Sequence, residues 1–261
     1  MIGSLRSFID NGLYKIRGFM HPVDAMAFSA ILEYQVREGM QGGIAEIGVF
    51  FGRSFSLLAR NAQSAGDRAL GIDLFDISGQ LDYVRAVIAR EGVQQATQLH
   101  AGSSLELTAR DVTDKIGPVR FFSVDGGHEL HHIAKDSELA IETLAPHGVI
   151  AFDDFLNPQY PDLTVGVIDF LRHTESVVPF CISRAKLYVC RPEFRDRYMT
   201  LIRTTPLWAS VEREEFTFLG HRIIFTSQSI INRGLYQKLA ERGLGRLGNF
   251  LTMQKQRRFA R

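Results

Sequence analysis

Between residues 42 and 191, short apolar runs alternate with stretches in which apolar residues recur at helical spacing. Apolar runs typical of strands begin near residues 44, 69, 97, 119 and 149. Strands that alternate with helices predict right-handed β-α-β units and a parallel sheet. Two further runs, residues 177–183 and 186–191, predict a hairpin that closes the sheet. The pattern therefore predicts an α/β fold with a Rossmann-like, doubly wound, mostly parallel seven-stranded sheet and an antiparallel closing hairpin.

The residues on either side of this core predict additional helices and one more hairpin. Pro22 opens a helix that ends at Gly39, and residues 216–225 predict a hairpin around Gly220. No internal repeat or clean linker separates these parts, so we expect one domain with appendages. The expected divisions are an N-terminal helical cap (1–40), a core (41–192), an appended helix and hairpin (193–231) and a C-terminal tail (232–261).

The composition indicates an ordinary globular chain. The chain has 261 residues, 45% of them hydrophobic, and a net charge of +1, which argues against disorder. No apolar run approaches the roughly 18 to 20 residues that cross a bilayer, and the first residues do not resemble a signal peptide. We therefore expect a cytoplasmic protein, at most peripheral to a membrane. Cys181 and Cys190 are too few for a disulfide scaffold, and the predicted hairpin would make them neighbours.

Basic charge is concentrated in the tail, residues 232–261. This segment has eight Lys and Arg residues and one acid, Glu241, so it carries +7 and leaves −6 on the remainder of the chain. Its interleaved Leu and Phe residues suit contact with a membrane or an anionic glycolipid. Packing on the body or on a second subunit of a homo-oligomer is an equally weighted alternative. No nucleic-acid partner is expected, because the negative body would repel phosphates.

Acidic residues and an imidazole follow the ends of two neighbouring predicted strands. One strand ends at Asp125-Gly-Gly-His128, and the other ends at Asp153-Asp154. The carboxyl ends of parallel strands lie on the same edge of a sheet, where ligands bind in open α/β folds. We therefore expect these four side chains to converge. The helix between the two strands is expected to carry Asp136 on its polar face.

Two segments are candidates to cover this site. Residues 19–21, Phe-Met-His, either fold over a ligand or pack against the sheet, and packing is the favoured interpretation. Residues 157–161, Asn-Pro-Gln-Tyr-Pro, predict a turn-rich loop over the site.

A glycine turn joins the first predicted strand to a helix. The motif is Glu46-x-Gly48-x-x-x-Gly52, and the helix begins near Ser54. Backbone amides at such a turn point outward, and glycines allow a ligand to approach closely. The spacing differs from the dinucleotide fingerprint because Val49 follows where another glycine would be needed, so a pyrophosphate fits less well.

Two later strand ends extend this candidate cofactor site. Asp73 ends the second strand, where a carboxylate can accept hydrogen bonds from a ribose diol. Ser103 follows the third strand and could border an adenine. The small residues around it could also cap a helix that we expect at residues 105–111.

These motifs together resemble the class I S-adenosylmethionine-dependent methyltransferases over residues 42–191. More narrowly, they are similar to the metal-dependent sugar O-methyltransferases of macrolide tailoring and related glycan-modifying proteins. The motifs are Glu46-x-Gly48-x-x-x-Gly52, Gly71-Ile72-Asp73, Asp125-Gly-Gly-His128 and Asp153-Asp154. The turn Gly-Val-Phe-Phe-Gly is less glycine-rich than in the family, and Pro-His-Gly at 146–148 replaces Pro-Gly-Gly.

The resemblance implies a role for each matched residue. S-adenosylmethionine would bind at Glu46, Gly48, Gly52, Ser54, Asp73, Ser103 and Asp125. A divalent metal, Mg²⁺ or Mn²⁺, would be held by Asp125, Asp153 and Asp154. His128 would be the general base, with Asp125 beside it in catalysis, and the acceptor would be a sugar or glycan hydroxyl.

The chemistry agrees with these roles. Methyl transfer to an alcohol requires two positioned reactants and the removal of a proton from a weak acid. Three carboxylates without a nearby thiol favour Mg²⁺ or Mn²⁺ over Zn²⁺. Two alternatives remain open, an NAD-dependent Rossmann enzyme and a non-catalytic assembly protein on a methyltransferase scaffold. The first would have no use for three converging carboxylates, and the complete acid set argues against the second.

Overall fold

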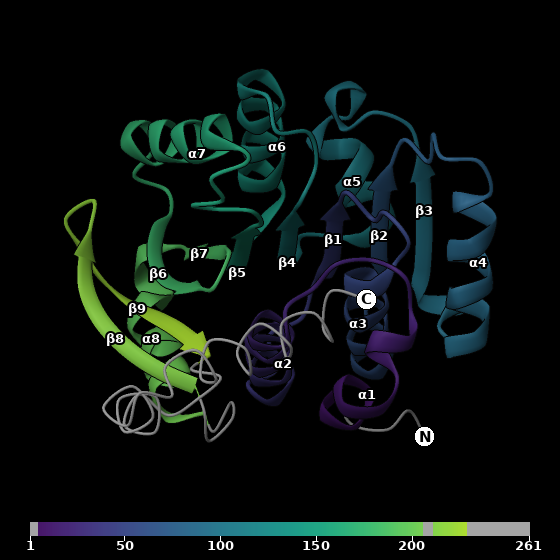
Figure 1. The fold of residues 1–261 in the computed structure, drawn as a ribbon, viewed down its shortest axis with the longest axis horizontal. Helices are drawn as coiled ribbons and strands as arrows, with labels where there is room; N and C mark the ends of the chain where they lie inside the picture. Colours follow the sequence, from purple (N-terminus) through teal and green to yellow (C-terminus); the bar gives the residue numbers. More distant parts are fainter. Residues whose placement is uncertain (1–4, 206–210, 229–261) are drawn as a thin grey trace, which may run out of the picture.

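The computed structural model describes residues 5–205 and 211–228, and these residues form one nine-stranded sheet with helices on both faces (Figure 1). The strand order is β3-β2-β1-β4-β5-β7-β6-β9-β8. The strands are β1 (Gly43–Ile47), β2 (Ala69–Asp73), β3 (Thr97–Ala101), β4 (Val119–Val124), β5 (Leu144–Phe152), β6 (Val178–Ser183), β7 (Lys186–Cys190), β8 (Val211–Phe218) and β9 (His221–Gln228). Strands β1 to β5 are mutually parallel and β7 is antiparallel to β5, which confirms the predicted architecture.

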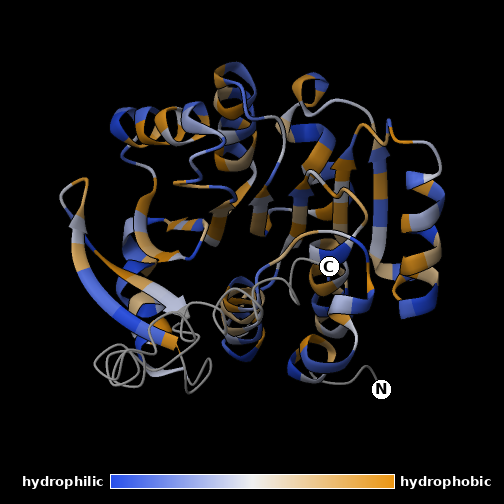
Figure 2. Ribbon diagram, viewed as in Figure 1, coloured by the Kyte–Doolittle hydropathy of each residue, from blue (hydrophilic) through white to orange (hydrophobic). Residues whose placement is uncertain are grey.

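The helices divide between the two faces of the sheet. They are α1 (Leu5–Asn11), α2 (Pro22–Arg37), α3 (Arg53–Ala65), α4 (Gln80–Glu91), α5 (Ala109–Ile116), α6 (Leu130–Thr143), α7 (Pro161–His173) and α8 (Arg195–Thr204). Apolar residues of α1 to α4 and α8 share one core cluster, and those of α5 to α7 share the other. Figure 2 shows that the central strands are mostly hydrophobic, as expected for strands covered on both sides.

The expected seven strands are present, and two further strands extend the sheet. The hairpin around Gly220 is longer than predicted, and its strand β9 pairs in parallel with β6. Pairing satisfies the backbone groups that the edge of β6 would otherwise leave open. The hairpin is therefore part of the sheet, and its outer strand β8 is largely hydrophilic (Figure 2).

One local expectation is wrong. The helix expected at 105–111 begins at Ala109, because Thr108 forms a capping box with Asp111, and only a short 3-10 turn precedes it. Cys181 and Cys190 are buried and free on adjacent strands of the predicted hairpin. They are not directly opposite, since Cys181 pairs with Tyr188 and Cys190 with Val178.

Two further expectations concern membranes and the tail. Across the part of the chain that the structure describes, no helix combines the length and apolar character needed to span a membrane. The predicted basic tail, residues 232–261, lies outside the described residues.

Candidate active site

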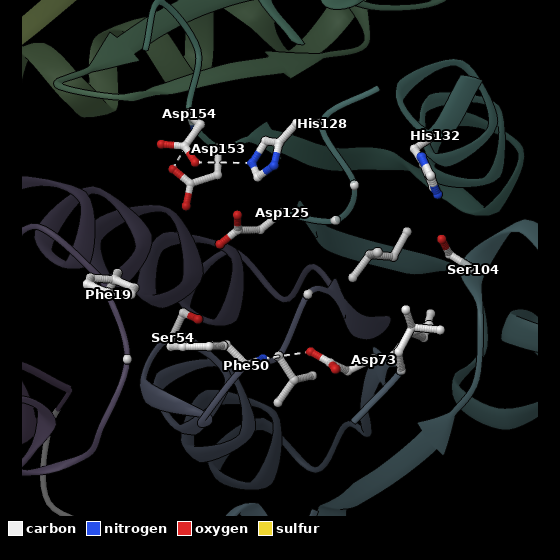
Figure 3. Close-up of a pocket in the computed structure, with 18 of the residues that line it drawn as sticks. Phe19, Phe50, Ser54, Asp73, Ser104, Asp125, His128, His132, Asp153 and Asp154 are labelled. Carbon is white, nitrogen blue, oxygen red and sulfur yellow. Dashed lines mark hydrogen bonds and ion pairs between the residues drawn. The ribbon is translucent and has the colours of Figure 1, made fainter. Parts of the chain in front are cut away.

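A cavity of about 660 Å³ opens at the carboxyl ends of β1, β2, β4 and β5 (Figure 3). Most of the predicted site residues line it, namely Gly48, Ser54, Asp73, Ser103, Asp125, His128, Asp153 and Asp154. Two others, Glu46 and Gly52, are not among its lining residues. The strand ends therefore converge as the sequence predicted, around one space with a glycine turn on one side and a group of acids on the other.

The glycine turn packs directly against the loop after β4. Gly48 has a φ of +85°, and a Cβ atom there would lie 1.7 Å from the backbone oxygen of Asp125. No side chain fits at that distance, and the left-handed backbone independently favours glycine. Gly48 thus lets the turn after β1 pack against the backbone at the start of the loop after β4.

Asp73 is fixed by the backbone on both sides of its carboxylate. One carboxylate oxygen accepts the N–H of Phe50 and the other accepts the N–H of Phe75, each at 2.7 Å. Both donors have left-handed φ values, near +50°, an uncommon conformation that these hydrogen bonds help to maintain. Asp73 therefore ties the end of β2 to the glycine turn at the edge of the cavity (Figure 3).

The remaining members of the glycine motif support the cavity from behind. Glu46 is fully buried on β1, and within the described residues neither of its carboxylate oxygens has a hydrogen-bond partner. Burial raises the pKa of Glu46 to about 8. Gly52 is the left-handed N-cap of α3, so it shapes the turn without reaching the cavity.

On the acidic side, Asp125, His128 and Asp154 form a compact group. Each offers a ligand atom, and these atoms all lie within 4.8 Å of one another. The Nε2 atom of His128 lies 3.3 Å from the carboxylate of Asp154, and its ring stacks on Tyr160 at a centroid distance of 3.7 Å. Two carboxylates and one imidazole fit a divalent cation, and the nitrogen suits Mn²⁺ better than Mg²⁺.

Asp153 belongs to a different set of contacts. Its carboxylate forms an ion pair with Lys186, the first residue of β7, and its other oxygen accepts the N–H of Asp154 at 2.8 Å. Lys186 is 2% exposed. Of the three carboxylates expected to bind a metal together, Asp125 and Asp154 therefore group with His128, whereas Asp153 pairs with Lys186 and also contacts the carboxyl group of Asp125.

Charge coupling separates these acids. Burial and the neighbouring Asp153 anion raise the pKa of Asp125 well above its usual value. Burial acts in the same direction on Asp153, but the Lys186 ammonium together with hydrogen bonds from Asp125, Lys186 and the backbone of Asp154 outweighs it and lowers the pKa of Asp153. Burial alone would lower the pKa of Lys186, yet the carboxylates of Asp153, Asp125 and Asp24 raise it. The Asp153–Lys186 pair is therefore ionised, and the negative charge of Asp153 disfavours ionisation of Asp125.

The sequence reasoning missed Lys186 and misplaced Asp136. Lys186 could have been found from topology, because β7 runs antiparallel to β5 and so begins where β5 ends, beside Asp153. Asp136 was expected on a polar helix face but is 1% exposed. It lies beneath the loop after β4, where a Cβ at Gly126 would lie 2.7 Å from its carboxylate. Burial raises the pKa of Asp136.

The segment before α2 contributes an aromatic ring to the cavity. Phe19 is 75% exposed, lines the cavity and stacks on Phe50 at a centroid distance of 5.7 Å (Figure 3). Met20 is buried and His21 caps α2 through its side chain. The favoured expectation, that this segment packs on the sheet, therefore holds for Met20 but is wrong for Phe19. Tyr160, from the predicted covering loop, lines the same cavity.

Comparison with known proteins gives one domain family and several similar folds. Residues 45–155 match a family model described as a methyltransferase domain, and no curated protein matches the chain. The solved structure of CalS11, a TDP-rhamnose 3'-O-methyltransferase in calicheamicin biosynthesis, is 20% identical with a TM-score of 0.55, over 72% of this chain and 86% of that one.

Two further solved structures have the same fold. The O-methyltransferase NovP is 13% identical with a TM-score of 0.54, over 65% of this chain and 78% of that one. The methyltransferase PaMTH1 of Podospora anserina, solved with S-adenosylhomocysteine, is 12% identical with a TM-score of 0.53, over 73% of this chain and 88% of that one. Residues 45–155 thus match a methyltransferase domain, and the fold is that of the class I S-adenosylmethionine-dependent methyltransferases.

Proposed function

We propose that this protein transfers a methyl group from S-adenosylmethionine to a hydroxyl of a sugar or glycan, with a divalent cation and a histidine base. The observation that carries the proposal is the single cavity with two unlike walls. One wall has the glycine turn and the fixed carboxylate of Asp73, and the other has Asp125, His128 and Asp154. A methyl donor and an acceptor hydroxyl must meet in one space, and these walls offer a place for each.

S-adenosylmethionine would occupy the glycine-turn side. Asp73 would accept hydrogen bonds from the ribose hydroxyls, and its two backbone hydrogen bonds support this role because they hold it ready before the ligand arrives. Ser103 would border the adenine, and Gly48 and Ser54 would face the methionine part. Glu46, one layer deeper, would hold its proton before the ligand binds, and the positively charged amino group of the ligand would favour its ionised form.

A divalent cation, Mg²⁺ or Mn²⁺, would be held on the acidic side. Asp125 and Asp154 have the hard oxygen donors that these ions prefer, and the ion pair of Asp153 with Lys186 would disfavour Asp153 as a third ligand. When bound, the ion would polarise the acceptor hydroxyl and ease the loss of its proton.

His128 would take the acceptor proton. As the sulfonium–methyl bond breaks and the oxygen–methyl bond forms, that proton would pass to the imidazole nitrogen that carries no hydrogen. Stacking on Tyr160 and the neighbouring carboxylate of Asp154 would hold the ring in place. An imidazole that instead bound the cation through the same nitrogen would be unable to act as the base, so the two roles of His128 are alternatives.

A sugar acceptor agrees with the rim of the cavity. Phe19 and Tyr160 present aromatic rings there, and sugar rings commonly pack their C–H faces on such surfaces. The name of CalS11 describes that protein as a TDP-rhamnose methyltransferase, which makes a sugar the first acceptor class to test here.

The test is label transfer from S-adenosylmethionine to a panel of nucleotide sugars, lipid-linked glycans and small phenols. We expect label on a sugar hydroxyl, loss of transfer in excess EDTA, and recovery with Mg²⁺ or Mn²⁺. Transfer at full rate in EDTA would remove the metal from the proposal. Transfer to phenols alone would remove the sugar.

The basic tail would add a second contact to this function. Residues 232–261 would bind an anionic membrane or glycolipid, or pack on the body or on a second subunit. Co-sedimentation with anionic vesicles at low salt distinguishes these possibilities. The full chain should pellet and a chain truncated after Ile231 should not, whereas two soluble chains would favour a contact within the protein or its oligomer.

A further inference from the structure

Two acids that are adjacent in the sequence have separate environments in the site. Asp154 lies with His128 and Asp125, and its ligand atom is within 4.8 Å of theirs. Asp153 forms an ion pair with Lys186 through one oxygen and accepts the backbone N–H of Asp154 through the other, whereas the contacts of Asp154 are with Asn157 and His128. A metal bound to Asp153 would therefore lie close to a buried ammonium group.

Lys186 is buried beside Asp153, its ion-pair partner within the described residues. It pairs with Ser183 in the tight β6–β7 hairpin, its side chain is 3% exposed, and its ammonium lies 5.3 Å from the ring centroid of Phe28. Two other carboxylates, Asp125 and Asp24, also raise the pKa of Lys186, and Asp24 accepts a hydrogen bond from the hydroxyl of Ser183 at 2.5 Å. Separation from Asp153 would leave a buried cation without its ion-pair partner, which is costly.

A fixed cation next to a metal site has two effects. It neutralises a carboxylate that would otherwise be a ligand, and it repels the incoming ion through surroundings that screen charge poorly. Both effects weaken the binding of a divalent ion, and the first also changes which oxygens are available to it.

We propose that Lys186 is a positioning residue that withholds Asp153 from the divalent cation, so that Asp125 and Asp154 are the carboxylates left to hold it. The inference rests on the metal site of the proposed function. In this account Asp154 is a metal ligand and Asp153 is not. The site should therefore bind a divalent cation more weakly than three free carboxylates would.

The test is the affinity of the full-length protein for Mn²⁺, measured without acceptor from the loss of the free-ion signal in electron paramagnetic resonance. Lys186→Met frees Asp153, so we expect it to bind Mn²⁺ at least about tenfold more tightly than the unmodified chain. Lys186→Arg keeps the charge and should stay within about threefold of the unmodified chain.

Two further variants separate the adjacent acids. The double variant Asp153→Asn with Lys186→Met removes the pair without changing the net charge, and should bind Mn²⁺ within about threefold of the unmodified chain. Replacing a buried ion pair by neutral groups commonly preserves folding. Asp154→Asn removes a ligand and should weaken binding about tenfold or more.

An unchanged or weaker affinity in a folded Lys186→Met variant overturns the inference, as does a double variant that binds like Asp154→Asn. Absence of Mn²⁺ binding in every variant overturns both this inference and the metal part of the proposed function. Methyl transfer itself is scored separately, by label transfer with Mn²⁺ and in excess EDTA, so its failure is distinguishable from failure of the role of Lys186.

Discussion

The two walls of the cavity hold their carboxylates by different means. Asp73, on the glycine-turn side, is held by two backbone N–H groups. Asp153 and Asp154, on the acidic side, are held mainly by side chains from other elements, Lys186 and His128. Backbone donors keep their position when a neighbouring side chain changes, whereas a network of side-chain charges responds as a unit. The glycine-turn wall should therefore tolerate substitutions of the acidic wall and the acidic wall those of the glycine-turn wall, except where the two walls share backbone.

Gly48 is that shared backbone, and its substitution should have the largest effect. Gly48→Ala places a Cβ 1.7 Å from the backbone oxygen of Asp125 and strains a left-handed residue, so we expect it to destabilise the fold by roughly 3 kcal/mol or more. Gly79→Ala is the control, because Gly79 is also left-handed (φ +74°) but has nothing within 4 Å. It should lose only about 1 kcal/mol. Equal losses in thermal unfolding would show that the close contact does not exist.

Removal of the His128 imidazole should slow methyl transfer without changing cofactor binding. His128→Ala is expected to lower kcat by about 10²- to 10⁴-fold, the usual contribution of a general base, and to leave the affinity for S-adenosylmethionine unchanged. Its activity should rise with hydroxide concentration, which replaces the base. His173→Ala, on an exposed helix end, is the matched control. Normal turnover in the His128 variant would exclude it as base.

Asp73→Ala, on the glycine-turn wall, should weaken cofactor binding and leave metal binding unchanged. Loss of hydrogen bonds to the ribose, together with loss of the anchor for Phe50, is expected to raise the Kd for S-adenosylmethionine about 10- to 100-fold. Mn²⁺ binding should be unchanged, because the acidic wall does not touch this carboxylate. Asp82→Ala, on the exposed surface of α4, serves as the control. An unaltered Kd in a folded variant would contradict the ribose assignment.

Buried Glu46, behind the glycine turn, should make the free energy of unfolding depend on pH. Because burial raises the pKa of Glu46 from 4.5 to about 8, the folded chain holds this proton more tightly than the unfolded chain does. The resulting stability is complete below about pH 4.5 and is lost as the pH rises through 8, with a slope of at most about 1.4 kcal/mol per pH unit. Glu46→Gln should flatten that slope in denaturant titrations between pH 5 and 8. Parallel slopes would show that Glu46 is already ionised.

The smallest effect is expected at the rim. Phe19→Ala removes an exposed ring that stacks on Phe50, and it should raise the acceptor KM about 3- to 10-fold while kcat and the S-adenosylmethionine affinity stay unchanged. Phe216→Ala, an exposed phenylalanine on β8, should leave all three unchanged. If the Phe19 variant loses cofactor affinity instead, the ring belongs to the glycine-turn wall.

The contrast between the walls also explains what the sequence could predict. Asp73 and Asp125 were found because each directly follows an apolar strand, and strand ends are local features of the chain. Lys186 was missed because its partner is determined by the antiparallel register of β7 on β5, which no local pattern encodes. Asp136 obeys helical spacing but is covered by the loop after β4. In the same way, the pairing of β9 with β6 depends on an edge that exists only after the sheet has formed.

The most direct test of the central claim, that the cavity binds S-adenosylmethionine on its glycine-turn wall, is calorimetric titration of the full-length protein. Separate titrations with S-adenosylmethionine, S-adenosylhomocysteine and NAD⁺ compare the two cofactor classes that this fold can bind. The account predicts that the two sulfur compounds bind with a Kd on the order of micromolar, about −8 kcal/mol, and that NAD⁺ gives no measurable heat. Binding of NAD⁺ with no binding of S-adenosylmethionine would contradict it.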